Sequence, residues 1–359
     1  MIAVSAPPVC IPDSAPAVQV TPAIVDPIEV GDWDNLIATH PASTFFHTRA
    51  WAKTLSGAYG FRCHYVTALN AGRMHGLLPI METRSWLRGT RAVSLPFTDH
   101  APMLTSNESQ RDALMEIATR AARAHGWQHL EMCADSNVEA NISYYTHRLA
   151  LDRSASQVFA HCASAVRRAV RKAERNGVSI RFATDPESVR DYYRLHCRTR
   201  TRLGSPPQPF RFFASICEHI LRQGHGFIAL AMHHGRPISG AVFFEFNGKA
   251  IYKFSAADER AQELRGANLV IWRAIEKLIS GGARELSFGR TSLSNDGLRR
   301  FKLSWGAGES VIARIRYCFA NESTTLVRDL ASGAQARIFA TLPVCVSRWA
   351  GYLAYPHLS

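Results

Sequence analysis

The densest run of residues able to bind a charged ligand spans residues 167–202, where eleven Arg or Lys stand against four Asp or Glu, a net charge of +7. Four of these cations have the i, i+3, i+4, i+7 spacing of one helix face, within a helix expected over about 157–176: Arg168, Arg171, Lys172 and Arg175. Guanidinium forks and compact ammonium charges both bind phosphates. We therefore predict Arg171 and Lys172 as ligands of a phosphate-bearing substrate, with a solvated helix face as the alternative.

Several other chemistries lack their motifs. The eight cysteines and fifteen histidines show no C-x-x-C pair and no metal-ligand spacing, so no metal is predicted. No G-x-S-x-G elbow or G-x-x-x-x-G-K-S/T loop is present, which disfavours serine hydrolase and P-loop chemistry. Because no Ser or Cys stands in an activated context, acyl transfer would proceed by direct attack through a tetrahedral intermediate.

The elements that must position such a site form two similar segments in a chain of 359 residues, a length that favours two domains. The first segment is expected to contain a hairpin, an extended piece, a helix that ends at a glycine, and a strand, at 65–81, 93–97, 108–124 and 127–132. The second repeats this order after about 155 residues, with strands at 227–232, 238–246 and 250–255, a helix at about 266–280 and a strand at 284–288. Such a period predicts a duplicated mixed α/β domain.

Five motifs, taken in order, resemble the FemAB family of peptidyltransferases, and more closely its branch found beside exopolysaccharide and protein-sorting (PEP-CTERM) systems; the BioF2-like acetyltransferase group is more distantly similar. The resemblance covers about residues 30–355. Its carriers are Trp51 with Gly76-Leu77-Leu78-Pro79, Ser94-Leu95-Pro96-Phe97-Thr98-Asp99, the run 167–178, Phe288-Gly289-Arg290, and Phe301-Lys302-Leu303-Ser304-Trp305-Gly306-Ala307. The resemblance implies a mixed α/β fold of two tandem acetyltransferase-like (GNAT) domains, with a cleft at the second domain and near the junction.

This fold divides the chain into four parts. Residues 1–29 are predicted as a disordered Pro/Ala-rich leader outside the core, 30–152 as the N-terminal GNAT-like domain, and 153–320 as the C-terminal GNAT-like domain, which includes a basic helical block at 157–203. Residues 321–359 are predicted as a helical tail, either packed against the first domain or docked at a membrane interface.

The resemblance also implies site residues. Lys302 is predicted to stabilise charge during acyl transfer and Asp99 to orient or deprotonate an amine. The residues predicted to bind substrate are Arg171, Lys172, Phe301, Tyr252, Arg290 and Trp305. The alternatives are an ordinary surface lysine at Lys302, a turn-forming residue at Asp99, core packing of Tyr252 and a structural ion pair at Arg290. A GNAT enzyme holds the donor pyrophosphate at a helix N-terminus, and the equivalent stretch here, with degenerate glycine spacing, ends in Arg265, Gly266, Ala267 and Asn268.

The resulting hypothesis is an acyltransferase that adds an acyl or amino-acid group to an amine of a cell-envelope or exopolysaccharide precursor. No tightly bound cofactor is expected, and the donor stays open between acyl-CoA and aminoacyl-tRNA because the chain lacks the long helical hairpin of some family members. The rival hypothesis is a non-catalytic GNAT-like module that docks nucleic acid or an anionic membrane through the basic block. A cytoplasmic location is predicted, because the scattered cysteines suit reduced thiols and the first thirty residues lack the Lys or Arg of a signal peptide. The protein is expected to be a monomer or weak dimer. Peripheral contact at the inner membrane face stays open.

Overall fold

A computed structural model describes residues 21–70, 73–85, 89–134, 143–327 and 341–357 as a mixed α/β fold. The strands are β1 (Thr21–Val25), β2 (Arg62–Cys63), β3 (Tyr65–Asn70), β4 (Arg73–Leu78), β5 (Met81–Ser85), β6 (Gly89–Val93), β7 (His129–Ala134), β8 (Tyr144–Ala150), β9 (Ser179–Ala183), β10 (Gly226–His233), β11 (Arg236–Phe246), β12 (Lys249–Ala257), β13 (Glu285–Ser292), β14 (Gly308–Cys318) and β15 (Ser323–Leu326). The α-helices are α1 (Trp33–Ala38), α2 (Arg49–Tyr59), α3 (Glu108–His125), α4 (Ala155–His161), α5 (Ser164–Arg175), α6 (Pro186–Arg202), α7 (Phe210–Ile216), α8 (Gly266–Ser280), α9 (Asp296–Leu303) and α11 (Val344–Ala354). Within these residues, none of the helices combines the length and apolar character needed to cross a bilayer.

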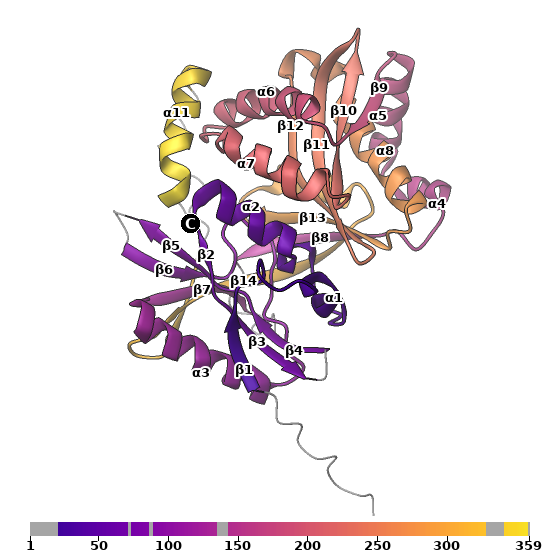
Figure 1. The fold of residues 1–359 in the computed structure, drawn as a ribbon. Helices are drawn as coiled ribbons and strands as arrows, with labels where there is room; N and C mark the ends of the chain where they lie inside the picture. The colour runs from indigo at the N-terminus through magenta and orange to yellow at the C-terminus, as the bar shows by residue number, and fades with distance from the viewer. Residues whose placement is uncertain (1–20, 71–72, 86–88, 135–142, 328–340, 358–359) are drawn as a thin grey trace, which may run out of the picture.

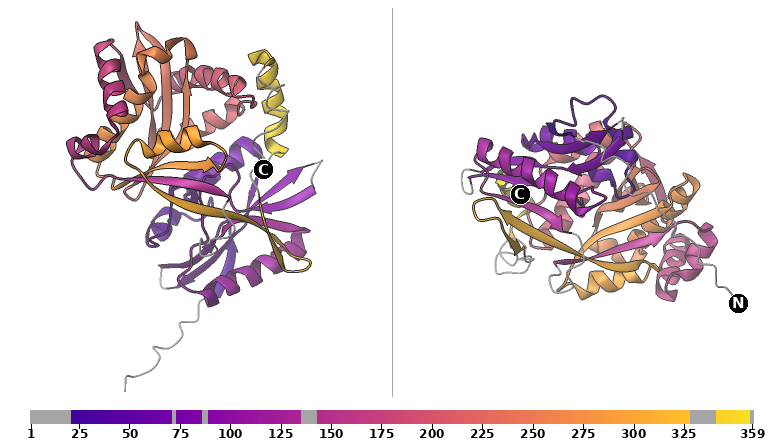
Figure 2. Two further views of the ribbon diagram at one scale, coloured as in Figure 1. Left: turned by 180° about the vertical axis from the view of Figure 1, so that it is seen from behind. Right: turned by 90° about the horizontal axis from the view of Figure 1, so that it is seen from below.

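One mixed sheet of twelve strands runs through both halves of the molecule, which we call the first half (residues 21–134) and the second half (residues 143–303). Its strand order is β2-β5-β6-β7-β14-β8-β13-β12-β11-β10-β9, with β15 beside β14. Strand β14 joins the halves, because its residues 308–312 pair with β8 and its residues 313–318 pair with β7. Figure 2 shows this long strand passing from one half to the other. The strands β1, β3 and β4 form a separate sheet in the first half. Backbone hydrogen bonds, and not a linker alone, therefore connect the two halves.

The predicted repeat is present in both halves. Strand β6, helix α3 and the parallel strand β7 form one unit, and β12, α8 and the parallel strand β13 form the other. Helix α8 has its predicted bounds, since its buried stripe ends where Gly281 and Gly282 stop the helix. The predicted turn Asn247-Gly248 joins β11 to β12 with φ angles of 49° and 73°, values that favour these two residue types.

The largest hydrophobic core belongs to both halves. Trp51 of α2, Phe212 of α7 and Phe244 of β11 are fully buried in it, and the Trp51 and Phe244 rings lie 5.8 Å apart. A second core fills the space between α5, α8 and the sheet, and a third lies under α3. In Figure 1, α6 and α7 cover one face of β10–β12 while α5 and α8 cover the other. Burial of the shared core holds the two halves together.

The single basic helix expected over 157–176 is two helices. Helix α4 ends at His161, the next residue, Cys162, has an extended ψ of 148°, and α5 begins at Ser164. The break lets the Ala163 amide donate to the Ser304 carbonyl at 2.8 Å. A tertiary hydrogen bond thus overrides the helical pattern, and it brings the start of α5 next to the end of α9.

The two chain ends also differ from expectation. Residues 21–25 form β1, which pairs with β3, and Val25 and Ile28 pack against the shared core, so the predicted leader is ordered from residue 21; residues 1–20 lie outside the described part. In the predicted helical tail, residues 323–326 form the strand β15 instead, because they pair with β14, and residues 328–340 lie outside the described part. Helix α11 and the turn after it contact both halves, because Gly351 packs against Pro207 and the Tyr355 ring lies 5.4 Å from that of Phe97.

Candidate active site

The strands β12 and β13 separate at the centre of the second half. Along the described length of both strands, pairing is confined to Lys249–Ile251 against Glu285–Ser287. Where the opening begins, the pairing of β12 with β11 skips Lys253, and the pairing of β13 with β8 shifts between Ser287 and Arg290. Such bulges re-aim side chains, and both lie where several charged groups meet. We call this place the junction.

Asp99 enters the junction from the first half. It ends the segment 94–99, in which Leu95 and Phe97 adopt left-handed φ angles of 61° and 58°, a conformation that costs free energy in non-glycine residues. The Trp51 indole donates to the Thr98 hydroxyl at 3.0 Å and holds the segment in place. The family-like run of residues 94–99 is therefore a strained loop that presents one carboxylate to the other half.

Lys253 is the partner of that carboxylate. Its ammonium donates to Asp99 Oδ2 at 2.8 Å and to the Phe97 carbonyl at 2.8 Å, and its side chain is only 5% exposed. Burial would raise the Asp99 pKa, but the charges of Lys253 and Arg290 and the hydrogen bond from Lys253 hold it below its usual value. Asp99 is thus a carboxylate at neutral pH.

Gly289 lets Asp99 approach β13 closely. It has a φ of 67°, and a Cβ placed there would lie 3.2 Å from the Asp99 carboxyl carbon. Any side chain at this position would crowd the carboxylate and would also strain the backbone.

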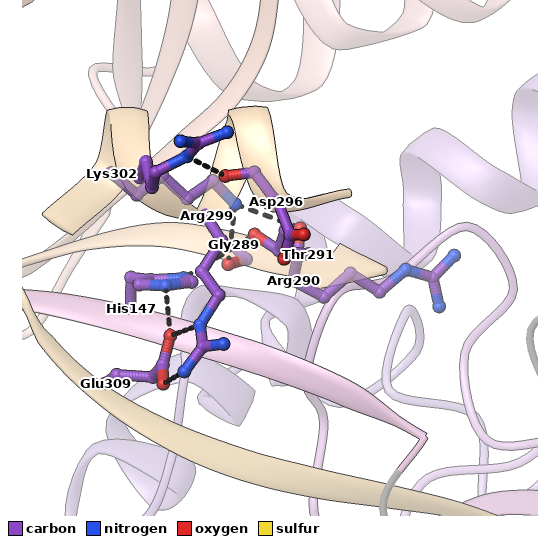
Figure 3. Close-up of polar contacts among 9 residues, drawn as sticks. His147, Gly289, Arg290, Thr291, Asp296, Arg299, Lys302 and Glu309 are labelled. Carbon is purple, nitrogen blue, oxygen red and sulfur yellow. Dashed lines mark hydrogen bonds and ion pairs between the residues drawn. The ribbon is translucent and has the colours of Figure 1, made fainter. Parts of the chain in front are cut away.

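Lys302 lies on the other side of Gly289. This lysine of α9 is 3% exposed, and its ammonium donates to the Gly289 carbonyl at 3.0 Å and to the Arg290 carbonyl at 2.9 Å. Burial lowers its pKa to about 8, and the nearby Asp99 charge opposes that shift. Figure 3 shows the side chain reaching these carbonyls. The structure thereby excludes an ordinary surface lysine at this position.

An ion-pair network anchors the base of α9. Arg299 donates to both oxygens of Glu309 at 2.7 Å, and the buried His147 places Nε2 3.0 Å from Glu309 Oε2 (Figure 3). The bidentate pair fixes the orientation of α9 relative to β14. These three residues thereby hold the helix that carries Lys302.

Arg290 follows the shifted register of β13. Its guanidinium lies over the Tyr144 ring at 4.7 Å and points away from Lys302 (Figure 3). Its Nη1 is buried without a hydrogen-bond partner among the described residues. Since its charge also lowers the Asp99 pKa, Arg290 belongs to the junction.

A cavity of about 680 Å³ opens at the start of α8, which we call the α8 cavity. Arg265, in a left-handed conformation, precedes the helix, and no side chain caps the helix start. Gly266 is the first helical residue, and a Cβ there would lie 2.9 Å from Ser239 Oγ, so only glycine allows this close approach. The Ser239 hydroxyl itself is buried, lines the cavity and has no partner among the described residues. An uncapped helix N-terminus attracts anions.

Cations surround this helix start. Arg168 and Lys172 of α5 and Arg265 line the α8 cavity, and within the described residues none of the three forms an ion pair. Arg202 also lines it but pairs with Glu259 at 3.8 Å. The cavity therefore combines positive side chains that form no ion pair among the described residues with a helix start that no side chain caps, an arrangement suited to a phosphate group.

The predicted site residues fall into two neighbouring groups. Lys302, Asp99 and Arg290 meet at the junction, while Lys172, Phe301 and all four residues of the predicted donor loop (Arg265, Gly266, Ala267 and Asn268) line the α8 cavity. Because Phe301 and Lys302 are adjacent on α9, this helix separates the two groups.

Three predicted substrate-binding residues lie elsewhere. Arg171 is exposed on α5 but does not line the α8 cavity, because it lies on a different face of the helix from Lys172. Trp305 is fully buried in the core, and Tyr252 packs between Phe243 and Phe288. Both rings pack in or against the second core, and neither lines the α8 cavity.

Lys253 and Arg168 are the residues that the sequence-based assignment left out. Strand alternation places Lys253 on the face opposite Tyr252, which is the signal available in the sequence. Its pairing with Asp99 depends on a bulge and on a loop of the other half, and neither can be read from a single strand. Arg168 shared the predicted stripe with Arg171, and only the packing of α5 distinguishes them.

Comparison with known proteins agrees with the fold. The family model described as "Acetyltransferase (GNAT) domain" matches residues 160–303, a span that includes α5, α8 and α9. No curated protein matches the chain in sequence.

Solved structures share the fold. A crystal structure of FemX has a TM-score of 0.69 at 14% identity, with 83% of this chain and 97% of that chain covered. A tandem GNAT protein from the clavulanic acid biosynthesis pathway has a TM-score of 0.51 at 16% identity, covering 82% and 98%. A Bacteroides thetaiotaomicron protein of unknown function has a TM-score of 0.57 at 10% identity, covering 84% and 99%. The chain therefore contains a GNAT acetyltransferase domain and has the predicted fold of two tandem GNAT-like domains.

Proposed function

We propose that this protein is an N-acyltransferase whose phosphate-bearing donor binds in the α8 cavity and whose acyl transfer takes place at the junction. One observation carries the proposal: the uncapped start of α8 faces unpaired cations, and the next element, α9, places a buried lysine beside the opening between β12 and β13. Phosphate recognition and a site for a developing negative charge are therefore adjacent.

In the proposed reaction the acceptor amine attacks the acyl carbonyl carbon directly. A new C–N bond forms through a tetrahedral intermediate, the bond from the carbonyl carbon to the donor sulfur or oxygen breaks, and the proton lost by the amine ends on the leaving group. The positive charge of Lys302 stabilises the oxyanion, and Asp99 orients the amine. Lys253 keeps Asp99 ionised and in place.

Acyl-CoA is the donor class that the cavity favours, and aminoacyl-tRNA is the second. The α8 cavity has the size of a small-molecule site, and its helix N-terminus fits a pyrophosphate. The acceptor, an amine of a cell-envelope or exopolysaccharide precursor, is proposed from the motif resemblance. A cytoplasmic location suits the seven cysteines that the structure describes, all of which are free thiols.

The test is donor binding by a matched pair of charge reversals on α5. We expect acetyl-CoA, longer acyl-CoA or aminoacyl-tRNA to raise the melting temperature of the protein in a donor panel. Lys172→Glu should weaken binding of that donor at least tenfold, because it replaces a phosphate-facing cation with an anion. Arg171→Glu makes the same charge change on the same helix outside the cavity and should alter binding less than about twofold.

Equal losses in both variants would contradict a specific donor cavity. If binding to tRNA or anionic vesicles then fell steeply with salt and no donor was turned over, the rival function, a non-catalytic docking module, would explain the basic helices.

A further inference from the structure

A cluster of metal-ligand side chains lies in the first half, on elements that contribute nothing to the junction or the α8 cavity. His64 connects β2 to β3, Glu82 is on β5, and His125 is in the last turn of α3. Their ligand atoms all lie within 4.8 Å of one another, and the described residues contain no other such group of three. We propose that His64, Glu82 and His125 form a binding site for a divalent transition-metal ion of the zinc class.

The distances fit coordination. His64 Nε2 lies 4.0 Å and His125 Nδ1 lies 3.6 Å from Glu82 Oε2. A tetrahedral zinc ion with bonds of about 2.0–2.2 Å holds neighbouring ligand atoms roughly 3.3–3.6 Å apart. Small side-chain rotations would therefore bring all three atoms onto one ion. Two imidazoles and one carboxylate form a ligand set typical of zinc and unsuited to Mg²⁺.

The ligands are held as those of a built site. The Glu82 side chain is 1% exposed, and it accepts hydrogen bonds from the Trp127 indole at 2.9 Å and from Arg84 at 2.8 Å. Such outer partners fix the orientation of a metal-binding carboxylate. His64 Nε2 is buried and has no hydrogen-bond partner among the described residues. A bound metal ion would satisfy this atom.

The charges around the cluster are mixed. Arg84 and Arg62 oppose a dication, although the Arg84 side chain is 62% exposed and well solvated. Two features favour a dication: the negative end of the α3 dipole, which lies at His125, and the nearby Asp26.

The wide spacing of these residues explains why the sequence predicted no metal. No two of the three lie at the short intervals of familiar zinc motifs, and only the approach of β5 to the end of α3 brings them together. The bound ion would tie the β2–β3 connection, β5 and α3 to one another, and it would stabilise the first half without taking part in acyl transfer.

Calorimetric titration of the untagged, chelator-treated full chain with Zn²⁺ tests the proposal. We expect one ion per chain, a higher melting temperature with zinc, and no effect of Mg²⁺. His125→Ala should weaken zinc binding at least tenfold, and the His64→Ala/His125→Ala variant should abolish it. The control variant His233→Ala/His234→Ala removes another adjacent histidine pair, whose rings lie 4.0 Å apart, and should bind zinc like the wild type.

Cobalt distinguishes this site from the cysteines. Co²⁺ should give the visible spectrum of nitrogen and oxygen ligands, without the thiolate charge-transfer band of a cysteine site. Undiminished zinc binding in the double variant, or no binding by the wild type at 100-fold excess zinc, would overturn the proposal. Circular dichroism of the metal-free variants separates lost binding from lost folding.

Discussion

The principal helices of the two halves, α3 and α8, occupy the same position in the repeat but begin in different ways. In the first half the Asn107 side chain caps α3 by accepting from the Gln110 amide at 2.9 Å, and Glu108 places a negative charge in the first turn. In the second half α8 has neither device, and its start faces a cavity surrounded by cations. One helix satisfies its own N-terminus, while the other leaves it free for a ligand anion.

Under the proposed function, this difference lets one fold carry a scaffold and a site together. The first half contributes Asp99 and the shared core, and the second half contributes the open helix start, Lys253 and Lys302. If this division is right, matched substitutions in the two halves should have unequal effects on donor binding and turnover.

The largest difference is expected between lysines. Lys302→Met keeps most of the side-chain volume but removes the buried charge, and it should lower turnover about a hundredfold. Lys53→Met makes the same change on α2 of the first half and should leave turnover within about twofold. Steady-state kinetics with the identified donor measures both, and equal rates for Lys302→Met and the wild type would remove Lys302 from the mechanism.

The pH dependence of stability follows from the same lysine. Its pKa in the folded protein is about 8, below its ordinary value, so the unfolded chain binds more protons than the folded protein between about pH 8 and 10.5. The wild type should therefore gain stability relative to Lys302→Met as pH rises through this window, by an amount on the order of 1–3 kcal/mol. Urea unfolding of both proteins at pH 7.5 and pH 10 measures the change. A flat difference would mean that Lys302 is not desolvated.

The helix starts give a smaller contrast. Gly266→Ala places a methyl group 2.9 Å from Ser239 Oγ and should shift the start of α8, weakening donor binding about tenfold. Glu108→Ala alters the corresponding first residue of α3 and should leave donor affinity unchanged. Binding isotherms decide this comparison, which fails if both substitutions or neither affect the donor.

The smallest effect concerns the cap itself. Asn107→Ala should cost about 1 kcal/mol of stability because the Gln110 amide loses its acceptor. Chemical denaturation measures the loss, and donor affinity should remain that of the wild type. A loss of donor affinity without a loss of stability would place the ligand at the wrong helix.

Much of the fold was predictable, because it depends on local signals. The apolar stripe of α8 and the Gly281-Gly282 pair after it determine where that helix lies in the sequence. The Asn247-Gly248 turn determines the hairpin of β11 and β12 that precedes it. The predicted donor loop lines one cavity for the same reason, since it lies directly before this helix.

Long-range contacts were not predictable. The break between α4 and α5 depends on a hydrogen bond to Ser304, and the role of Lys253 depends on a bulge and a loop of the other half. Trp305 belongs to a family-like motif, yet only the packed core shows that its ring is fully buried. Residues next to one another in sequence, such as Arg171 and Lys172, can therefore have different surroundings.

The most direct test of the open helix start is the backbone amide spectrum of ¹⁵N-labelled protein during titration with acetyl-CoA. The account predicts that the Gly266 and Ala267 amide signals shift on binding, while those of Glu108 and Gln110 at the start of α3 do not. Binding that shifts the α3 amides, or that leaves the Gly266 and Ala267 signals in place, would contradict it.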